Sequence, residues 1–264
     1  MSASLKFNSS SAPSRASLQP PPMSQPLRIG IAVFFVLEAL LAFAPIAVLG
    51  PAFGWPASLR NAAAQQLTAI AAAPPALALG YGLYLLYSLA IAPVAIVVAW
   101  RVANCKGPMA AMIVAFGTLS AITRGLGILR WLTVMPVLAT SYAVADGASD
   151  VAARSTIETV FTAINSYGGG IGELFGVALF GGLWLLVAMI AALTSRRLPA
   201  WLAGYGLIVA VLQLALFMPA FGMASPVSVA IAVSLFSLWL IAFAGHLVFK
   251  SHQERNTTLA ARSA

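Results

Sequence analysis

Charged residues are scarce in this sequence of 264 residues. It contains 14 Lys and Arg and 6 Asp and Glu, so 8% of its residues are charged, against about 25% in a typical soluble domain. Hydrophobic residues make up 61% of the chain, and the mean hydropathy is +0.95. So few charges cannot solvate a globular surface of this size, which argues against a soluble enzyme or binding domain. The composition indicates an integral membrane protein whose first partner is the lipid bilayer.

Cysteine and histidine are almost absent as well. The single cysteine is Cys105 and the two histidines are His246 and His252, so the chain offers no internal disulfide and no cluster of metal ligands. We therefore expect no metal and no cofactor. An intramembrane enzyme is the least supported class, because no nucleophile–base set is present. The pI near 10.3 does not indicate nucleic acid, since the basic residues occur in ones and twos rather than in patches.

Long apolar runs fill most of the remaining sequence. Six of them reach the roughly 20 residues that a membrane-spanning helix needs, and they lie at 28–50, 75–100, 109–139, 170–193, 199–219 and 226–249. The sequence thus predicts an all-α, polytopic membrane helix bundle with six transmembrane helices. The third run is too long for a perpendicular span, so we expect it to be tilted or kinked before Pro136.

The segments outside the spans complete the predicted organisation. Residues 1–27 are rich in Ser, Pro and Gln and are expected to form a disordered cytoplasmic tail. A transmembrane domain follows at 28–249, and 250–264 forms a second cytoplasmic tail. Residues 56–73 and 149–166 are expected to form two short extracytoplasmic surface helices, because they carry apolar residues near helical spacing between the spans.

The distribution of Lys and Arg predicts the orientation of the bundle. With six spans and a cytoplasmic N-terminus, both termini are cytoplasmic and the cytoplasmic segments hold most of the basic residues. Those residues are Lys6, Arg15, Arg28, Arg101, Lys106, Arg196, Arg197, Lys250, Arg255 and Arg262. The extracytoplasmic segments hold only Arg60 and Arg154. We accordingly expect a multi-pass protein of the bacterial cytoplasmic (inner) membrane.

Four charged residues fall inside the predicted spans: Glu38, Arg124, Arg130 and Glu173. Charges at membrane depth are costly, so they usually face the bundle interior, pair with each other and mark functional sites. At a rise of about 1.5 Å per residue, Glu38 lies about 15 Å deep, Arg124 about 24 Å, and Arg130 and Glu173 roughly 30–35 Å. Depth therefore favours an Arg130–Glu173 pair. A Glu38–Arg124 pair is the weaker prediction, and Arg124 could instead reach Glu173.

Two further patterns concern helix packing and a possible ligand cavity. Gly168, Gly172 and Gly176 recur every four residues, as do Gly117, Ala121 and Gly125, which predicts close packing of the third and fourth spans. Three tyrosines, Tyr81, Tyr84 and Tyr87, follow one another at intervals of three residues. Tyr84 and Tyr87 either line a ligand cavity with Glu38 or belong to ordinary helix packing.

Several motifs resemble one known family. The segments are Gly-Leu-Gly-Ile-Leu-Arg-Trp-Leu-Thr-Val-Met-Pro-Val-Leu-Ala at 125–139, Ile-Glu-Thr-Val-Phe-Thr-Ala-Ile-Asn-Ser-Tyr-Gly at 157–168, and Gly172-Glu173. They are similar to a bacterial six-helix membrane family catalogued as domain of unknown function 4386. The resemblance implies six spans and directs attention to Arg130, Trp131, Glu158 and Asn165 beside Glu173. Members often carry His after Gly-Glu, where this chain has Leu174. The resemblance implies no reaction.

Two functional hypotheses remain open. The first is a small-ligand or ion-handling, transporter-like bundle in which Glu38, Arg124 and Glu173 line a polar cavity, with Arg130 fixing helix register. The second is a structural or sensory membrane protein whose ion pairs only hold the bundle together. A small molecule or ion is the expected ligand in the first case, and no oligomeric state is indicated.

Overall fold

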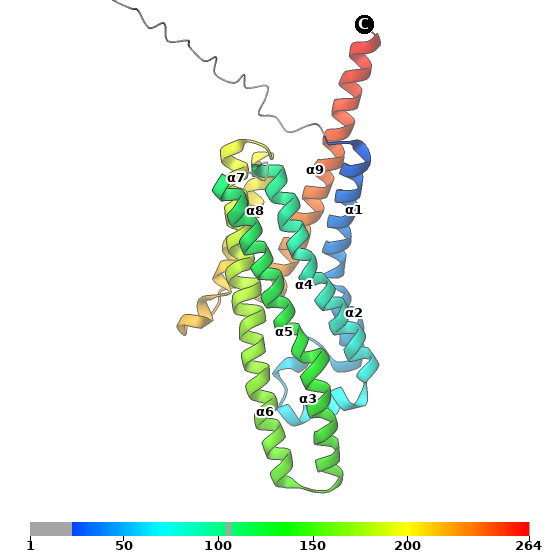
Figure 1. Ribbon diagram of the computed structural model, residues 1–264, viewed down its shortest axis with the longest axis vertical. Helices are drawn as coiled ribbons and strands as arrows, with labels where there is room; N and C mark the ends of the chain where they lie inside the picture. Colours follow the sequence, from blue (N-terminus) through cyan, green and yellow to red (C-terminus); the bar gives the residue numbers. More distant parts are fainter. Residues whose placement is uncertain (1–22, 104–106, 264) are drawn as a thin grey trace, which may run out of the picture.

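The computed structural model describes residues 23–103 and 107–263, and side chains up to Phe249. Helix accounts for 88% of the structure, with no strand in the described part of the chain. The start of α1 and the end of α9 lie at the same end of the elongated bundle (Figure 1). We call this the terminal end, and the opposite end, where α5 and α6 meet, the distal end. The predicted tail at 1–27 falls mostly outside the described residues, and Gln25 already belongs to α1.

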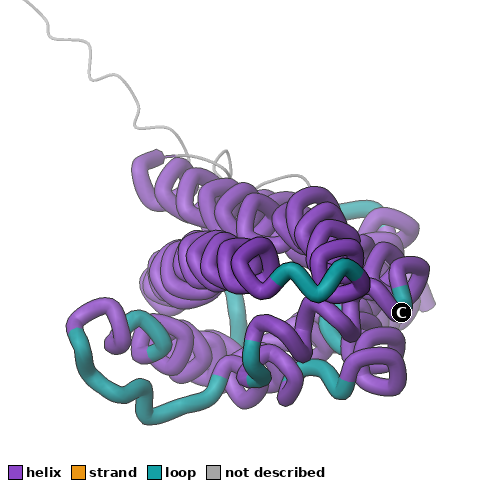
Figure 2. The backbone as a smooth tube through the Cα atoms, turned by 90° about the horizontal axis from the view of Figure 1, so that it is seen from below, coloured by secondary structure: helices purple, strands orange, loops and turns teal. Residues whose placement is uncertain are grey.

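Six segments are long and apolar enough to cross a membrane, as the sequence predicted. They are Gln25–Phe53, Pro74–Ala103, Gly107–Gly147, Val151–Ser195, Ala200–Phe221 and Val229–Phe249. Figure 2 shows the helices running side by side and joined by loops. The third segment is one continuous helix, α5 (Gly107–Gly147), which contains Pro136.

The first span is interrupted, although its apolar run is continuous in the sequence. Helix α1 (Gln25–Leu41) is separated by two residues, Ala42 and Phe43, from α2 (Ala44–Phe53). Proline has no N–H to donate to the carbonyl four residues earlier, and Pro45 occupies the first turn of α2. The Phe43 N–H instead donates to the Leu40 carbonyl at 3.0 Å. A proline at this position therefore accounts for the break four residues beyond Glu38.

The connection from the first to the second span contains the first predicted surface helix. After a short 3-10 turn, η2 (Ala57–Arg60), helix α3 (Ala63–Ala72) lies over the distal ends of α4 (Pro74–Ala103) and α5. Its inner face buries Leu67 and Ile70. The buried Gln66 side chain donates from Nε2 to the Asn61 carbonyl at 2.8 Å, which holds the preceding turn in place.

The second predicted surface helix is not a separate element. Helix α6 (Val151–Gly169) continues through the π-helical segment η3 (Gly170–Phe180) into α7 (Gly181–Ser195), so this helical segment is 45 residues long. Together with α5 it forms a long hairpin that extends beyond the ends of the other helices (Figure 1). The Asp150 carboxylate caps α6 by accepting from the Ala153 N–H at 2.9 Å. The sequence could not exclude a break here, because glycine-rich segments often end helices.

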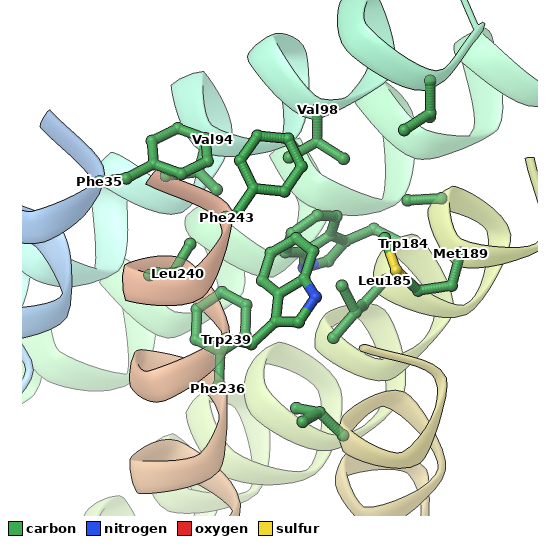
Figure 3. Close-up of a cluster of buried hydrophobic side chains, with 14 of the residues drawn as sticks. Phe35, Val94, Val98, Trp184, Leu185, Met189, Phe236, Trp239, Leu240 and Phe243 are labelled. Atoms are coloured by element: carbon green, nitrogen blue, oxygen red, sulfur yellow. The ribbon is translucent and has the colours of Figure 1, made fainter. Parts of the chain in front are cut away.

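Helices α8 (Ala200–Ala215) and α9 (Val229–Ser263) complete the bundle, with a short 3-10 turn, η4 (Met218–Phe221), between them. Helix α9 packs against α1 and α8, while α4, α5 and α7 pack against one another. The largest core cluster lies in the half of the bundle nearer the terminal end. Figure 3 shows its aromatic centre, where Phe35, Trp184, Phe236, Trp239 and Phe243 meet from α1, α7 and α9.

Candidate functional site

Glu38 lies on the buried face of α1. Only 2% of its surface is exposed, and the same helix face buries Ala32, Phe35 and Ala39, a spacing typical of a helix packed along one side. Both carboxylate oxygens, Oε1 and Oε2, are buried, and neither has a hydrogen-bond partner among the described residues. Nearly all buried polar groups in proteins are hydrogen-bonded, so this carboxyl group is an exception that packing alone does not explain.

Arg124 is a buried cation in the same region as Glu38. It is 4% exposed on α5, and its guanidinium lies within electrostatic range of the Glu38 carboxyl. Among the residues that the structure describes, no nitrogen–oxygen contact of 4.0 Å or less joins the two side chains. The structure thus places Glu38 and Arg124 in one region. The sequence analysis predicted a pair of these two residues, but the structure does not join them in a direct ion pair.

Arg124 is held by a carbonyl of the π-helical segment. Its Nε donates to the Gly176 carbonyl at 3.3 Å, and the Ser120 hydroxyl donates to the same oxygen at 2.6 Å. The Gly181 N–H donates to this carbonyl as well, across the wide turn that closes η3. A Cβ on Gly176 would lie 2.7 Å from the Arg124 Cγ. Glycine at 176 therefore lets the arginine lie flat against η3.

Gln213 of α8 joins this cluster, and the sequence analysis missed it. It is 2% exposed, and its Oε1 has no hydrogen-bond partner in the described structure. A Cβ on Gly181 would lie 2.9 Å from Arg124 Nη2 and 3.4 Å from Gln213 Oε1. Both polar atoms therefore border the space that the absent side chain leaves. The sequence did contain an indication, because Gln213 is a polar side chain within an otherwise apolar span.

Tyr84 and Tyr87 extend the cluster along α4. The Tyr87 ring is 6.0 Å from the Arg124 guanidinium carbon and its centroid is 6.1 Å from that of Tyr84. Tyr87 is 1% exposed, and its hydroxyl, like that of the neighbouring Ser88, is buried without a partner in the described residues. We call Glu38, Tyr87, Arg124 and Gln213, together with Ser88, the buried polar cluster.

Arg130 lies outside this cluster, and its hydrogen bonds go to groups other than the expected partner Glu173. Arg130 Nε donates to Asn165 Oδ1 at 3.2 Å, Nη1 donates to the Gly127 carbonyl, and the guanidinium carbon lies 5.4 Å from the centre of the Trp131 ring. The described part of the chain contains no ion pair between Arg130 and Glu173. Because α6 runs directly into η3, Asn165 is placed opposite Arg130 instead.

Glu173 and Glu158 are also separate from the buried polar cluster. Glu173 lies on an exposed part of η3, and it does not occupy the first turn of a helix, because the helical segment begins at Val151. The Arg130 guanidinium lies within electrostatic range of its carboxyl. Glu158 is half-buried on α6, 15 residues before Glu173, or about 22 Å along a helix. Because Glu173 is exposed and Glu158 is half-buried, neither belongs to the buried polar cluster.

The glycines of α6 and η3 face α5, as predicted, whereas the small residues of α5 face a different helix from the one expected. Gly168, Gly172 and Gly176 face α5, as expected, and there they lie closest to Arg130, Gly127 and Arg124, in that order. A Cβ on Gly117 or Gly125 would meet side chains of α4, namely Ala95 and Leu89. The small-residue stripe of α5 thus packs on α4, and a different face of α5 receives η3.

The described residues hold no group of three or more His, Cys, Asp or Glu side chains arranged to bind a metal ion. Cys105 and Lys106 lie outside the described residues.

Six membrane-length helices around a buried polar cluster define a multi-pass membrane protein. The chain belongs to the family described as Domain of unknown function (DUF4386), whose sequence model matches residues 30–251. This is the family that the third- and fourth-span motifs predicted. No curated protein and no solved structure matches the chain.

Proposed function

We propose that this protein is an ion-handling, transporter-like membrane bundle in which Glu38 binds and releases a proton or another small monovalent cation. One observation carries the proposal: the Glu38 carboxyl is 2% exposed and both of its oxygens lack a hydrogen-bond partner in the described residues. An uncompensated buried charge destabilises a fold strongly. A carboxyl group that binds an ion becomes neutral, which removes this penalty while the ion is bound.

The contrast with Arg130 supports this assignment. A structural charge is expected to have its hydrogen bonds satisfied, and Arg130 donates to both Asn165 and Gly127. Glu38 has no such partner in the part of the chain described. The structural hypothesis therefore accounts well for Arg130 and poorly for Glu38.

Arg124 serves as the internal counter-charge in this proposal. Its guanidinium is fixed on the Gly176 carbonyl and lies within electrostatic range of Glu38. When no ion is bound, the positive charge of Arg124 attracts the Glu38 carboxylate. When an ion binds, the ion takes the place of Arg124 in neutralising the carboxylate. The Gln213 Oε1, which has no hydrogen-bond partner in the described structure, is available to a bound ion or ligand in the same region.

A flux measurement tests the proposal. Wild-type protein, Glu38→Gln and the matched control Glu173→Gln are reconstituted into vesicles containing a pH-sensitive dye. Proton entry is then driven by a potassium diffusion potential, and sodium and potassium gradients are tested in the same way. We expect flux above that of protein-free vesicles for wild type and Glu173→Gln, and loss of flux for Glu38→Gln. Equal flux in wild type and Glu38→Gln, or none above protein-free vesicles, would refute the proposal and favour the structural hypothesis.

The proposed location is the bacterial cytoplasmic membrane with both termini in the cytoplasm. Support comes from the excess of Lys and Arg in the segments assigned to the terminal end. Alkaline phosphatase fused after Ala264 should be inactive, whereas phosphatase inserted at Ser149, in the turn between α5 and α6, should be active. The reverse pattern would invert the orientation.

A further inference from the structure

A small cavity lies beneath α3 at the distal end of the bundle. Its volume is about 40 Å³, and its walls include Leu49, Trp55, Gln66, Tyr81 and Trp131. About 10–15 Å³ of such volume is enough for one water molecule. The indole N–H of Trp55 is buried without an acceptor among the described residues. We call this space the distal cavity, and its size suits a water molecule.

A row of aromatic side chains leads from the distal cavity to the buried polar cluster. The Trp55 ring in the cavity wall lies 6.0 Å from that of Tyr84, the Tyr84 ring lies 6.1 Å from that of Tyr87, and the Tyr87 ring lies 6.0 Å from the Arg124 guanidinium. Tyr84 and Tyr87 are three residues apart and so lie on the same side of α4. Each contributes a hydroxyl that can both donate and accept a hydrogen bond.

Among the residues that the structure describes, the terminal side of Glu38 offers no comparable row. Continuing along the same face of α4 toward the terminal end, Tyr87 is followed by Ile91, Val94 and Val98, all 0% exposed. Phe35, one turn from Glu38 on the terminal side, packs against Phe243 with ring centroids 5.2 Å apart. Figure 3 shows Phe35, Val94, Val98 and Phe243 in the space between α1, α4 and α9. The core is therefore apolar on one side of Glu38, and hydroxyl groups lie on the other.

We infer that Glu38 exchanges protons with the distal side of the membrane, through the distal cavity and the hydroxyls of Tyr84 and Tyr87. This inference rests on the proposed role of Glu38 and adds its direction of access. In each hop a tyrosine oxygen accepts a proton from the cavity side and passes its own proton onward. One O–H bond forms and one breaks, the tyrosine stays neutral, and the net result is one proton moved from distal water to the Glu38 carboxylate.

Removal of single hydroxyl groups tests the route. Tyr84→Phe and Tyr87→Phe keep the rings and remove the relays, and Tyr167→Phe is the matched control, because Tyr167 is 75% exposed. Infrared spectroscopy of the reconstituted protein follows the carbonyl band of the protonated Glu38 carboxyl after transfer to D₂O, with Glu38→Gln identifying the band. We expect deuterium exchange to slow roughly tenfold or more in both relay variants, as for loss of a proton-transfer group, and to be unchanged in Tyr167→Phe.

The side of access is tested separately with a thiol reagent. In a Cys105→Ser background, Gln65→Cys places a thiol at the exposed edge of the distal cavity, since Gln65 is one of its lining residues. A membrane-impermeant, bulky thiosulfonate should slow exchange at Glu38 when added on the distal side and have no effect when added on the terminal side.

The outcomes separate this inference from the proposed function. Equal exchange rates in wild type, Tyr84→Phe and Tyr87→Phe, with a Glu38 band present and Glu38-dependent flux intact, would overturn the route alone. Absence of any Glu38-dependent band or flux would overturn the proposed function itself.

Discussion

The close approach of α5 and η3 makes a sharp prediction for Gly127→Ala. A Cβ at Gly127 would lie 2.6 Å from the Gly172 Cα and 2.9 Å from both the Gly172 nitrogen and the Gly168 carbonyl oxygen. All three are backbone atoms, so no side-chain rotation can relieve the clash. The two helices must separate where they now touch.

The size of the effect follows from these distances. Ordinary contacts of a Cβ begin at 3.4 Å, so the nearest backbone atom must move by about 0.8 Å. Overpacking of this kind destabilises by about 1–3 kcal/mol, and rigid backbone on both sides favours the upper value. Replacing Gly by Ala in a helix also stabilises the helix, by up to about 1 kcal/mol, and this gain offsets part of the loss. We therefore expect the free energy of unfolding to fall by about 2 kcal/mol.

Equilibrium unfolding in mixed micelles of a mild detergent and dodecyl sulfate, followed by tryptophan fluorescence, measures this change. Gly82→Ala is the control, because a Cβ at Gly82 meets nothing within 4 Å and should leave stability unchanged or slightly raised. Gly172→Ala should be milder than Gly127→Ala, since its nearest contact is 3.2 Å. If Gly127→Ala stayed within about 0.5 kcal/mol of wild type, the usual range for substitutions away from close contacts, the close approach of these helices would be refuted.

Further predictions concern the charged residues, each checked by the same unfolding measurement. Arg130→Gln and Asn165→Ala should each lower the free energy of unfolding by about 1 kcal/mol, and the double variant should lose less than the sum, because both remove the 3.2 Å hydrogen bond between them; additive losses would contradict a shared bond. Asp146→Asn breaks the 2.6 Å ion pair of the α5–α6 turn, but this carboxylate is 58% exposed, so the loss should not exceed about 0.5 kcal/mol. Glu38→Gln should leave stability unchanged or raised, because it removes a buried charge without a hydrogen-bond partner in the described residues; a loss above about 1 kcal/mol would reveal a stabilising interaction.

The number of spans was predictable because membrane insertion depends mainly on the local free energy of transferring each segment from water to lipid. Each apolar run carries that information in its own residues, so six were found from the sequence and six are present. The same reasoning isolated Glu38 and Arg124, since a charge within an apolar run is visible without a structure. The family motifs, too, are read directly from contiguous residues.

Pairing between helices was less predictable, because depth alone does not determine rotation about the helix axis. Arg130 and Glu173 were expected at similar depth, yet Glu173 lies on an exposed part of η3 and Arg130 donates to Asn165. The glycine stripe on α5 was recognised, but it faces α4 rather than η3. Hydropathy gives the position of a residue along the membrane normal and leaves the facing residue undetermined.

The sequence by itself thus determined the membrane class, the six spans and the presence of charged residues in mid-span. Only the tertiary structure decided that Gln213 and Tyr87 join Glu38 and Arg124, and that Gly176 supplies the carbonyl which holds the arginine. The physical reason is that burial in lipid is a property of one segment, whereas a polar cluster exists only once several helices adopt a common register. Here that register depends on backbone contacts such as Gly127 against Gly172, between residues 45 positions apart in the chain.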